Sequence, residues 1–139
     1  MYERVLVGLD RSDHARRALD AARELAKLAD GEVRVLHIRE GKVMFGRGAP
    51  LEDDTEEAAE ALVNAAVKEL TDAGVRATGV VLATLSGAVA GDIIGEGKEW
   101  GATVIVLASR GLTDLAGILL GSTTHNVIHL CEIPVVVVR

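Results

Sequence analysis

Hydrophobic positions along the chain form two patterns, short apolar runs and longer segments in which apolar residues recur at helical spacing. The run RVLVGL, residues 4–9, is apolar on both parities, which is typical of a strand covered on both faces. We therefore expect this first strand to lie in the middle of a sheet. Further strands are expected at residues 32–38, 76–84, 102–107 and 135–138.

Helices are expected between these strands. Ser12 is the expected N-cap of the first helix, and Gly31 stands where a left-handed residue would end it. Asp54 with Glu57 frames a capping box for the second helix. The apolar stripes of these two helices are Ala15, Ala18, Leu19, Ala22, Leu25, Ala26 and Ala29 in the first, and Ala59, Val63, Ala66, Val67 and Leu70 in the second.

Two shorter helices are expected at residues 88–100 and 122–130, the former weakened by Gly91, Gly95 and Gly97 unless close packing on the sheet explains them. Strands and helices that alternate at this spacing favour parallel strands joined by right-handed crossovers. The sequence therefore predicts one domain over residues 1–139, an α/β fold with a doubly wound five-stranded parallel sheet in the order 3-2-1-4-5, Rossmann-like, with helices on both faces.

The segment from Glu40 to Asp53 carries three glycines and Pro50 without periodicity. Two interpretations remain open for it, a lid over a site and a disordered piece of surface.

Composition narrows the class of partner. The formal net charge of −6 disfavours a nucleic-acid partner, and no apolar stretch approaches the roughly 18 residues of a membrane span. Cys131 is the single cysteine, as expected in a reducing compartment. We therefore expect a soluble, cytoplasmic protein with neither nucleic acid nor membrane as partner.

A ligand site is expected where the strand order reverses, between the first and fourth strands, because the loops leaving them diverge there. Asp10 follows the first strand and can accept hydrogen bonds from ribose hydroxyls. The stretch ASRGLTDLAGILLGSTT, residues 108–124, follows the fourth, and its glycines let backbone N–H groups approach phosphate. Ser122 and Thr123 begin a helix whose positive end favours an anion. Each feature alone is typical of an ordinary cap or turn, but their meeting on two adjacent loops predicts a mononucleotide site.

The chain resembles the universal stress protein family over essentially its whole length, from VLVGLDRSDHARRAL to GSTTHNVIHLCEIPVVVVR. The nucleotide-binding branch of that family is marked by Gly-x-x-Gly, nine residues, then Gly-Ser or Gly-Thr. Here Gly111, nine residues, Gly121 and Ser122 match, whereas Ala108 replaces the first glycine.

The resemblance implies ATP binding, with Gly8, Leu9 and Asp10 at the adenosine and Ile38 against the base. Ala108, Gly111, Gly121, Ser122 and Thr123 would line the phosphates, and Ser109 and Arg110 complete the candidate site. Alanine at position 108 is expected to weaken binding by about tenfold, either because the position requires positive φ or because a methyl group crowds the ligand.

The leading functional hypothesis is an ATP-binding stress-response regulator in which nucleotide occupancy is the conformational signal, with ATP, ADP or AMP as ligand, with or without Mg²⁺. An apolar terminal strand, Val135 to Val138, predicts a homodimer through that edge, as the resemblance also implies. The alternatives are a nucleotide-free homodimeric interaction module of the same fold and a slow ATPase. No residue is assigned a catalytic role.

Two other groups of residues are of types that bind metals or act as bases. His125 and His129, one helical turn apart and followed by Cys131, resemble a metal-binding arrangement, but no further ligand lies close in sequence, and no metal site made of protein side chains alone is predicted. His37, at the end of the second strand, is expected to be packed or hydrogen-bonded rather than to act as a base.

Overall fold

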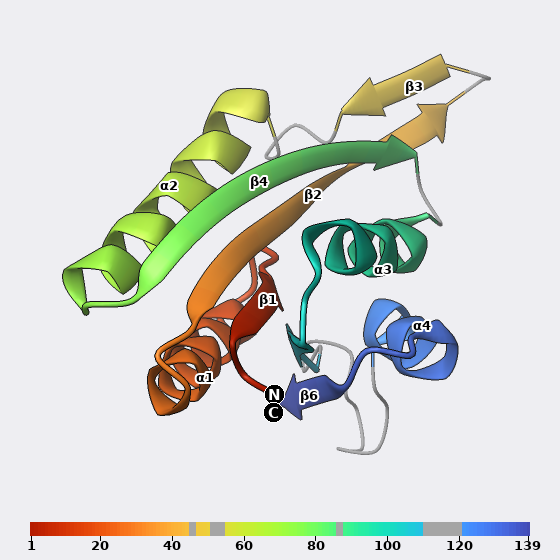
Figure 1. Cartoon of the computed structure of the whole chain (residues 1–139). Helices are drawn as coiled ribbons and strands as arrows, with labels where there is room; N and C mark the ends of the chain where they lie inside the picture. Colours follow the sequence, from red (N-terminus) through yellow and green to blue (C-terminus); the bar gives the residue numbers. More distant parts are fainter. Residues whose placement is uncertain (45–46, 51–54, 86–87, 110–120) are drawn as a thin grey trace.

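The computed structural model describes residues 1–44, 47–50, 55–85, 88–109 and 121–139. Strands and helices alternate along it as the sequence predicts, with one extra strand after the second (Figure 1). The elements are β1 (Arg4–Gly8), α1 (His14–Leu28), β2 (Glu32–Met44), β3 (Arg47–Pro50), α2 (Glu56–Asp72), β4 (Arg76–Leu85), α3 (Val89–Trp100), β5 (Val104–Ala108), α4 (Ser122–Leu130) and β6 (Val135–Val138).

The parallel strands stand in the order β4-β2-β1-β5-β6. Numbered among the parallel strands alone, this is the order 3-2-1-4-5, so the predicted fold class is confirmed. β1 lies between β2 and β5, and its three central residues are fully buried, as a run that is apolar on both parities requires.

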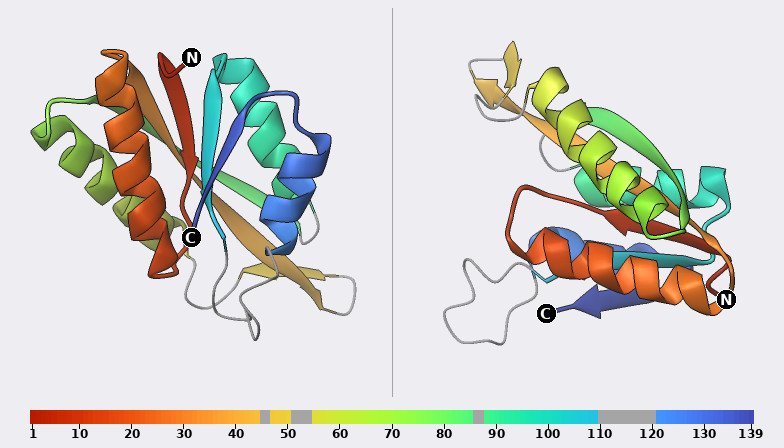
Figure 2. Two further views of the ribbon diagram at one scale, coloured as in Figure 1. Left: turned by 90° about the horizontal axis from the view of Figure 1, so that it is seen from below. Right: turned by 90° about the vertical axis from the view of Figure 1, so that its left-hand side faces the viewer.

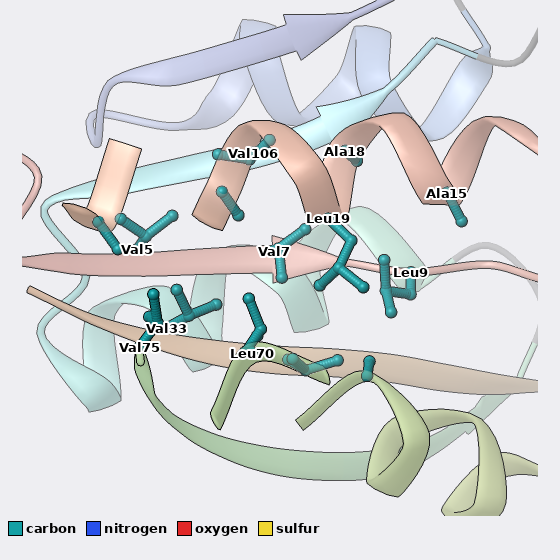
Figure 3. Close-up of a cluster of buried hydrophobic side chains, with 14 of the residues drawn as sticks. Val5, Val7, Leu9, Ala15, Ala18, Leu19, Val33, Leu70, Val75 and Val106 are labelled. Carbon is teal, nitrogen blue, oxygen red and sulfur yellow. The ribbon is translucent and has the colours of Figure 1, made fainter. Parts of the chain in front are cut away.

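The helices form two layers, with α1 and α2 on one face of the sheet and α3 and α4 on the other (Figure 2). Alternate side chains of β1 enter the two cores: Val5 and Val7 join the α1/α2 cluster, and Leu6 joins the α3/α4 cluster. Figure 3 shows the first of these clusters, in which valines of the strands meet small residues of α1 and Leu70 of α2. The predicted apolar stripes of both helices join or pack against this core, except that Ala29 is the C-cap of α1 and Ala59 is buried outside the cluster.

β2 runs further than expected. It continues to Met44, its last residues pair with the antiparallel β3, and it stays paired with β4 as far as Gly41 opposite Leu85. The interpretation of Glu40 to Asp53 as disordered surface was therefore wrong for residues 40–44 and 47–50, and a lid over the site stays a prediction. These residues form strands because they pair with neighbouring segments, which the local pattern of apolar residues does not reveal.

Three features expected at helix ends are each displaced by one residue. Asp13, not Ser12, is the N-cap of α1, and Thr55, not Asp54, is the N-cap of α2, where its hydroxyl accepts from the amide of Ala58 at 3.1 Å. At the end of α1, Asp30 has the positive φ of 48° that was expected of Gly31. Aspartate tolerates this conformation better than most residues because its short polar side chain bonds locally.

Gly31 is required for a different reason. A Cβ at this position would lie 2.4 Å from the carbonyl oxygen of Tyr2 and 2.7 Å from that of Glu3, so the turn after α1 packs directly on the start of β1. In α3, close packing explains only Gly97, whose added Cβ would meet Ile105 and Ile133 at 3.1 Å, whereas Gly91 and Gly95 have open space beside them. Among the described residues, no helix has the length and apolar character needed to cross a membrane.

Candidate functional site

The carboxyl ends of β1 and β5 lie side by side, next to the middle of β2, which continues to Met44. Gly8 of β1 is in register with Leu36 of β2, and Val7 is in register with Val106 of β5. At this level of the sheet lie Ile38 within β2, Leu9 and Asp10 directly after β1, and Ala108 at the end of β5. The structure thus brings together the two strand ends after which the mononucleotide site was predicted, while residues 110–120 of the second loop lie outside the described residues.

Leu9 is fixed on both sides where the chain leaves β1. Its amide donates to the carbonyl of Leu36 at 2.8 Å, and its carbonyl accepts from Nδ1 of His37 at 2.7 Å. Figure 3 shows Leu9 just beyond the end of β1, beside the first turn of α1. His37 is packed and hydrogen-bonded, as expected, and that it does not act as a base stays a prediction.

The carboxylate of Asp10 is oriented by its own loop. Its Oδ1 accepts from the amide of Ser12 at 2.8 Å and from the Ser12 hydroxyl. This is a short local turn of the kind aspartate commonly forms. Ser12, expected to cap α1, instead holds Asp10 in place.

Gly8 and Ile38 belong to the sheet side of the site. A Cβ on Gly8 would lie 2.7 Å from Cδ2 of Leu107, so glycine allows β1 and the end of β5 to pack closely. Ile38 is half-buried and packs against the α3/α4 cluster, of which Leu107 is part. Its partial exposure leaves apolar surface at this edge of the sheet.

Ala108 ends β5 in ordinary strand geometry. It is in register with Val138 of β6, and the next residue, Ser109, donates its amide to the Val138 carbonyl at 2.8 Å. Among the described residues other than glycine, only Asp30 has positive φ. Of the two reasons given for weaker binding with Ala108, the requirement for positive φ is therefore wrong, and crowding by the methyl group stays a prediction.

The start of α4 is tied to the end of β5. Thr124 is buried, and its hydroxyl donates to the carbonyl of Ala108 at 3.1 Å. The N-cap of α4 is Gly121, which has no side chain to accept from the amides of the first turn, while Ser122 is the exposed first residue of the helix and Thr123 is half-buried. Thr124 was missed in the sequence, where its place as the last hydroxyl of GSTT was the only signal.

Arg110 and Gly111, also predicted as site residues, lie outside the described residues. The described candidates come from the carboxyl ends of β1 and β5, from the middle of β2, and from the start of the helix tied to β5; they are Gly8, Leu9, Asp10, Ile38, Ala108, Ser109, Gly121, Ser122 and Thr123.

In the part of the chain that the structure describes, the histidines of α4 have no further metal-ligating side chains beside them. The rings of His125 and His129 are exposed and stack with their centroids 5.9 Å apart, and Cys131 packs against the α3/α4 cluster. Within the described parts of the chain, no group of three or more histidine, cysteine, aspartate or glutamate side chains is placed to hold a metal ion.

A doubly wound parallel sheet with oriented polar loops at the carboxyl edge of its central strands defines an α/β protein with a candidate ligand site at the point where strand order reverses. Its family follows from comparison with known sequences. The model of the universal stress protein family matches residues 1–139, and the chain belongs to this family.

Individual relatives agree with this assignment. Universal stress protein YxiE of Bacillus subtilis is 35% identical over 148 residues, with both chains covered completely. The solved structure of MJ0577 from Methanocaldococcus jannaschii is 28% identical, with a TM-score of 0.77 over 99% of this chain and 96% of that one. A universal stress protein from Archaeoglobus fulgidus, solved in complex with dAMP, is 24% identical, with a TM-score of 0.72 over 99% of this chain and 98% of the other.

Proposed function

We propose that this chain is an ATP-binding stress-response regulator in which nucleotide occupancy is the conformational signal. The observation that carries the proposal is the hydrogen bond from Thr124 to the carbonyl of Ala108, because it fixes the start of α4 at the end of β5, beside the loop that holds Asp10. A helix N-terminus and an oriented carboxylate on neighbouring loops suit the phosphate and ribose ends of one nucleotide. The dAMP complex of the A. fulgidus protein supports the same fold as a holder of adenine nucleotides.

Each part of the ligand has a candidate partner. The Asp10 carboxylate would accept hydrogen bonds from ribose hydroxyls, with Gly8 and Leu9 against the adenosine, and Ile38 would supply apolar contact for the base. The amides at the start of α4, from Ser122 and Thr123, would meet the phosphates, as would Ala108, Ser109, Arg110, Gly111 and Gly121. Mg²⁺, where present, would accompany the phosphates rather than be held by protein side chains.

The test removes the ribose acceptor. Asp10→Ala should weaken ATP binding by about 10- to 100-fold, since hydrogen bonds to a charged group contribute about 1.5–3 kcal/mol. Titration calorimetry of wild type and variant with ATP, ADP and AMP measures the effect and ranks the ligands. Asp13→Ala is the matched control, because it removes the same charge from an exposed residue of the same loop, one whose side chain does not cap α1.

Equal affinity in the Asp10 and Asp13 variants would contradict the assignment of Asp10. Before titration, denaturing the purified protein and analysing the released material by absorbance and chromatography detects any nucleotide carried through purification. No released nucleotide and no ATP binding at millimolar concentration would favour an interaction module of the same fold. Metal-dependent ATP turnover abolished by Asp10→Ala would favour a slow ATPase.

We further propose a cytoplasmic homodimer that forms through β6. This strand pairs with β5 on one side, no other strand pairs with it in the described parts of the chain, and its four valines are all only partly buried. An apolar edge of this kind favours pairing with a second copy. Equilibrium sedimentation should detect a dimer at micromolar concentration, and a pure monomer there would refute the β6 pairing.

A further inference from the structure

We infer that His37 is a positioning residue of the candidate nucleotide site, which sets the place of Asp10 by holding the carbonyl of Leu9. This inference rests on the proposed function of the site. It assigns a role to a buried histidine that would not itself touch the ligand.

The hydrogen bond lies where the backbone ladder between β1 and β2 stops. The last backbone bond of that ladder runs from the amide of Leu9 to the carbonyl of Leu36, at 2.8 Å. The carbonyl of the same residue then turns to the side chain of His37, at 2.7 Å. At Leu9, the residue directly before Asp10, a bond from a side chain thus follows the last backbone bond between the two strands.

The chemistry of the contact defines the tautomer. A carbonyl oxygen only accepts, so Nδ1 of His37 must carry the hydrogen that lies between them. His37 is 4% exposed and lies, by the alternation of β2, on the same face as Val33 and Val35. A donor held this firmly by packing restricts the plane of the Leu9 peptide group, which is also the peptide group that leads into Asp10.

The loop from Leu9 to Ser12 links the His37 bond to the direction of the Asp10 carboxylate. The Asp10 carboxylate is held against the amide of Ser12 at 2.8 Å, so the loop from Leu9 to Ser12 is fixed at both of its ends. If the Leu9 carbonyl loses its donor, its peptide group is free to rotate, and the carboxylate loses its fixed direction toward the ribose. Loss of a preorganised acceptor weakens binding even though the acceptor itself remains.

Two substitutions of His37 test whether its Nδ1 donor matters for binding. His37→Asn places an amide nitrogen the same number of bonds from the backbone as Nδ1 and should keep the donor, whereas His37→Leu keeps volume and removes it. We expect about tenfold weaker ATP binding in His37→Leu and near wild-type affinity in His37→Asn. Val33→Ala is the control, because it disturbs the same face of the same strand at the end away from the site and should leave affinity unchanged.

A double-mutant cycle separates positioning from general damage. If His37 acts through Asp10, adding His37→Leu to Asp10→Ala should cost no further affinity, measured by displacement of a fluorescent adenine nucleotide. A further tenfold loss in that background would overturn the inference. So would equal weakening in the leucine and asparagine variants, or wild-type affinity in His37→Leu.

A second readout needs no nucleotide. Hydrogen exchange of the Ser12 amide should quicken in His37→Leu and stay as in wild type in His37→Asn and Val33→Ala. If the wild-type protein binds no adenine nucleotide, the proposed function fails, yet this exchange rate still decides whether His37 positions the loop. Unchanged Ser12 exchange in His37→Leu overturns the positioning role whatever the ligand result.

Discussion

Both ends of the parallel sheet carry bonds between side chains and backbone, as Thr103 makes with Arg4 at the amino end, and the amino end adds charged pairs around an aromatic ring. At the amino end, charged side chains pair with one another around an aromatic ring: the Trp100 ring lies 4.5 Å from the guanidinium carbon of Arg4 and 5.0 Å from that of Arg34, and Arg34 also bonds Glu96 at 2.7 Å. At the carboxyl end, side chains bond the backbone where strands stop, as His37 does at Leu9.

The difference separates stability from ligand binding. The amino-end contacts join α3 to β1 and β2 and involve none of the candidate site residues. The carboxyl-end contacts from His37, Thr124 and Ser12 hold the residues at the start of the loops that would meet a ligand. Damage at the amino end should therefore lower the free energy of unfolding without changing nucleotide affinity, and changes at the carboxyl end should alter affinity at small cost in stability.

The largest expected effect is that of Gly31→Ala at the amino end. The new methyl group would meet backbone carbonyls of Tyr2 and Glu3 at 2.4 and 2.7 Å, and backbone cannot swing aside as a flexible side chain can. Overpacking of this kind costs about 1–3 kcal/mol, which exceeds the roughly 0.4–1 kcal/mol that alanine contributes by restricting the unfolded chain. We expect a net loss of about 2 kcal/mol, measured by urea unfolding followed through Trp100 fluorescence.

Gly95→Ala provides the opposite result at a matched substitution. This glycine lies within α3 with nothing within 4 Å of an added Cβ, so alanine should raise stability by about 0.5–1 kcal/mol through helix propensity. Both variants should bind ATP with wild-type affinity while folded. A several-fold weaker affinity in folded Gly31→Ala would break the separation between the two ends.

Much of the fold was predictable because most of its strands and helices have a recognisable pattern of apolar residues within their own segment. The apolar run at residues 4–9 and the helical spacing of α1 and α2 predicted a central strand and two helices, and their alternation predicted the strand order. The extension of β2 and the presence of β3 were not predictable, because they depend on pairing between segments that show no pattern alone.

The same contrast holds for the site. Topology alone predicted that the carboxyl ends of β1 and β5 are adjacent, so Asp10 and Ala108 could be named in advance. The contacts that orient these loops could not, because Thr124 bonds a residue 16 positions away and His37 one 28 positions away. The sequence around a hydroxyl or an imidazole does not indicate which distant carbonyl will accept its hydrogen bond.

The smaller effect is expected at the carboxyl end, from Ala108→Gly. Ala108 closes β5 with ordinary strand geometry, so its methyl group acts on a ligand by crowding and not by backbone strain. Removing it should tighten ATP binding by up to about tenfold, equivalent to about 1.4 kcal/mol, and should lower stability by about 0.5–1 kcal/mol because glycine loses more backbone freedom on folding.

Calorimetric titration and urea unfolding of the Ala108→Gly variant measure the two changes separately. Ser109→Gly is a suitable control, since it adds the same freedom one residue further on while keeping the amide that bonds the carbonyl of Val138. Tighter binding in Ala108→Gly alone would assign the gain to the removed methyl group. Unchanged affinity would show that this methyl group does not reach the ligand, and equal gains in both variants would assign the effect to loop freedom. Either of the last two results would end the steric account of Ala108, while the separation of the two ends would still rest on the contrast between Gly31→Ala and Asp10→Ala.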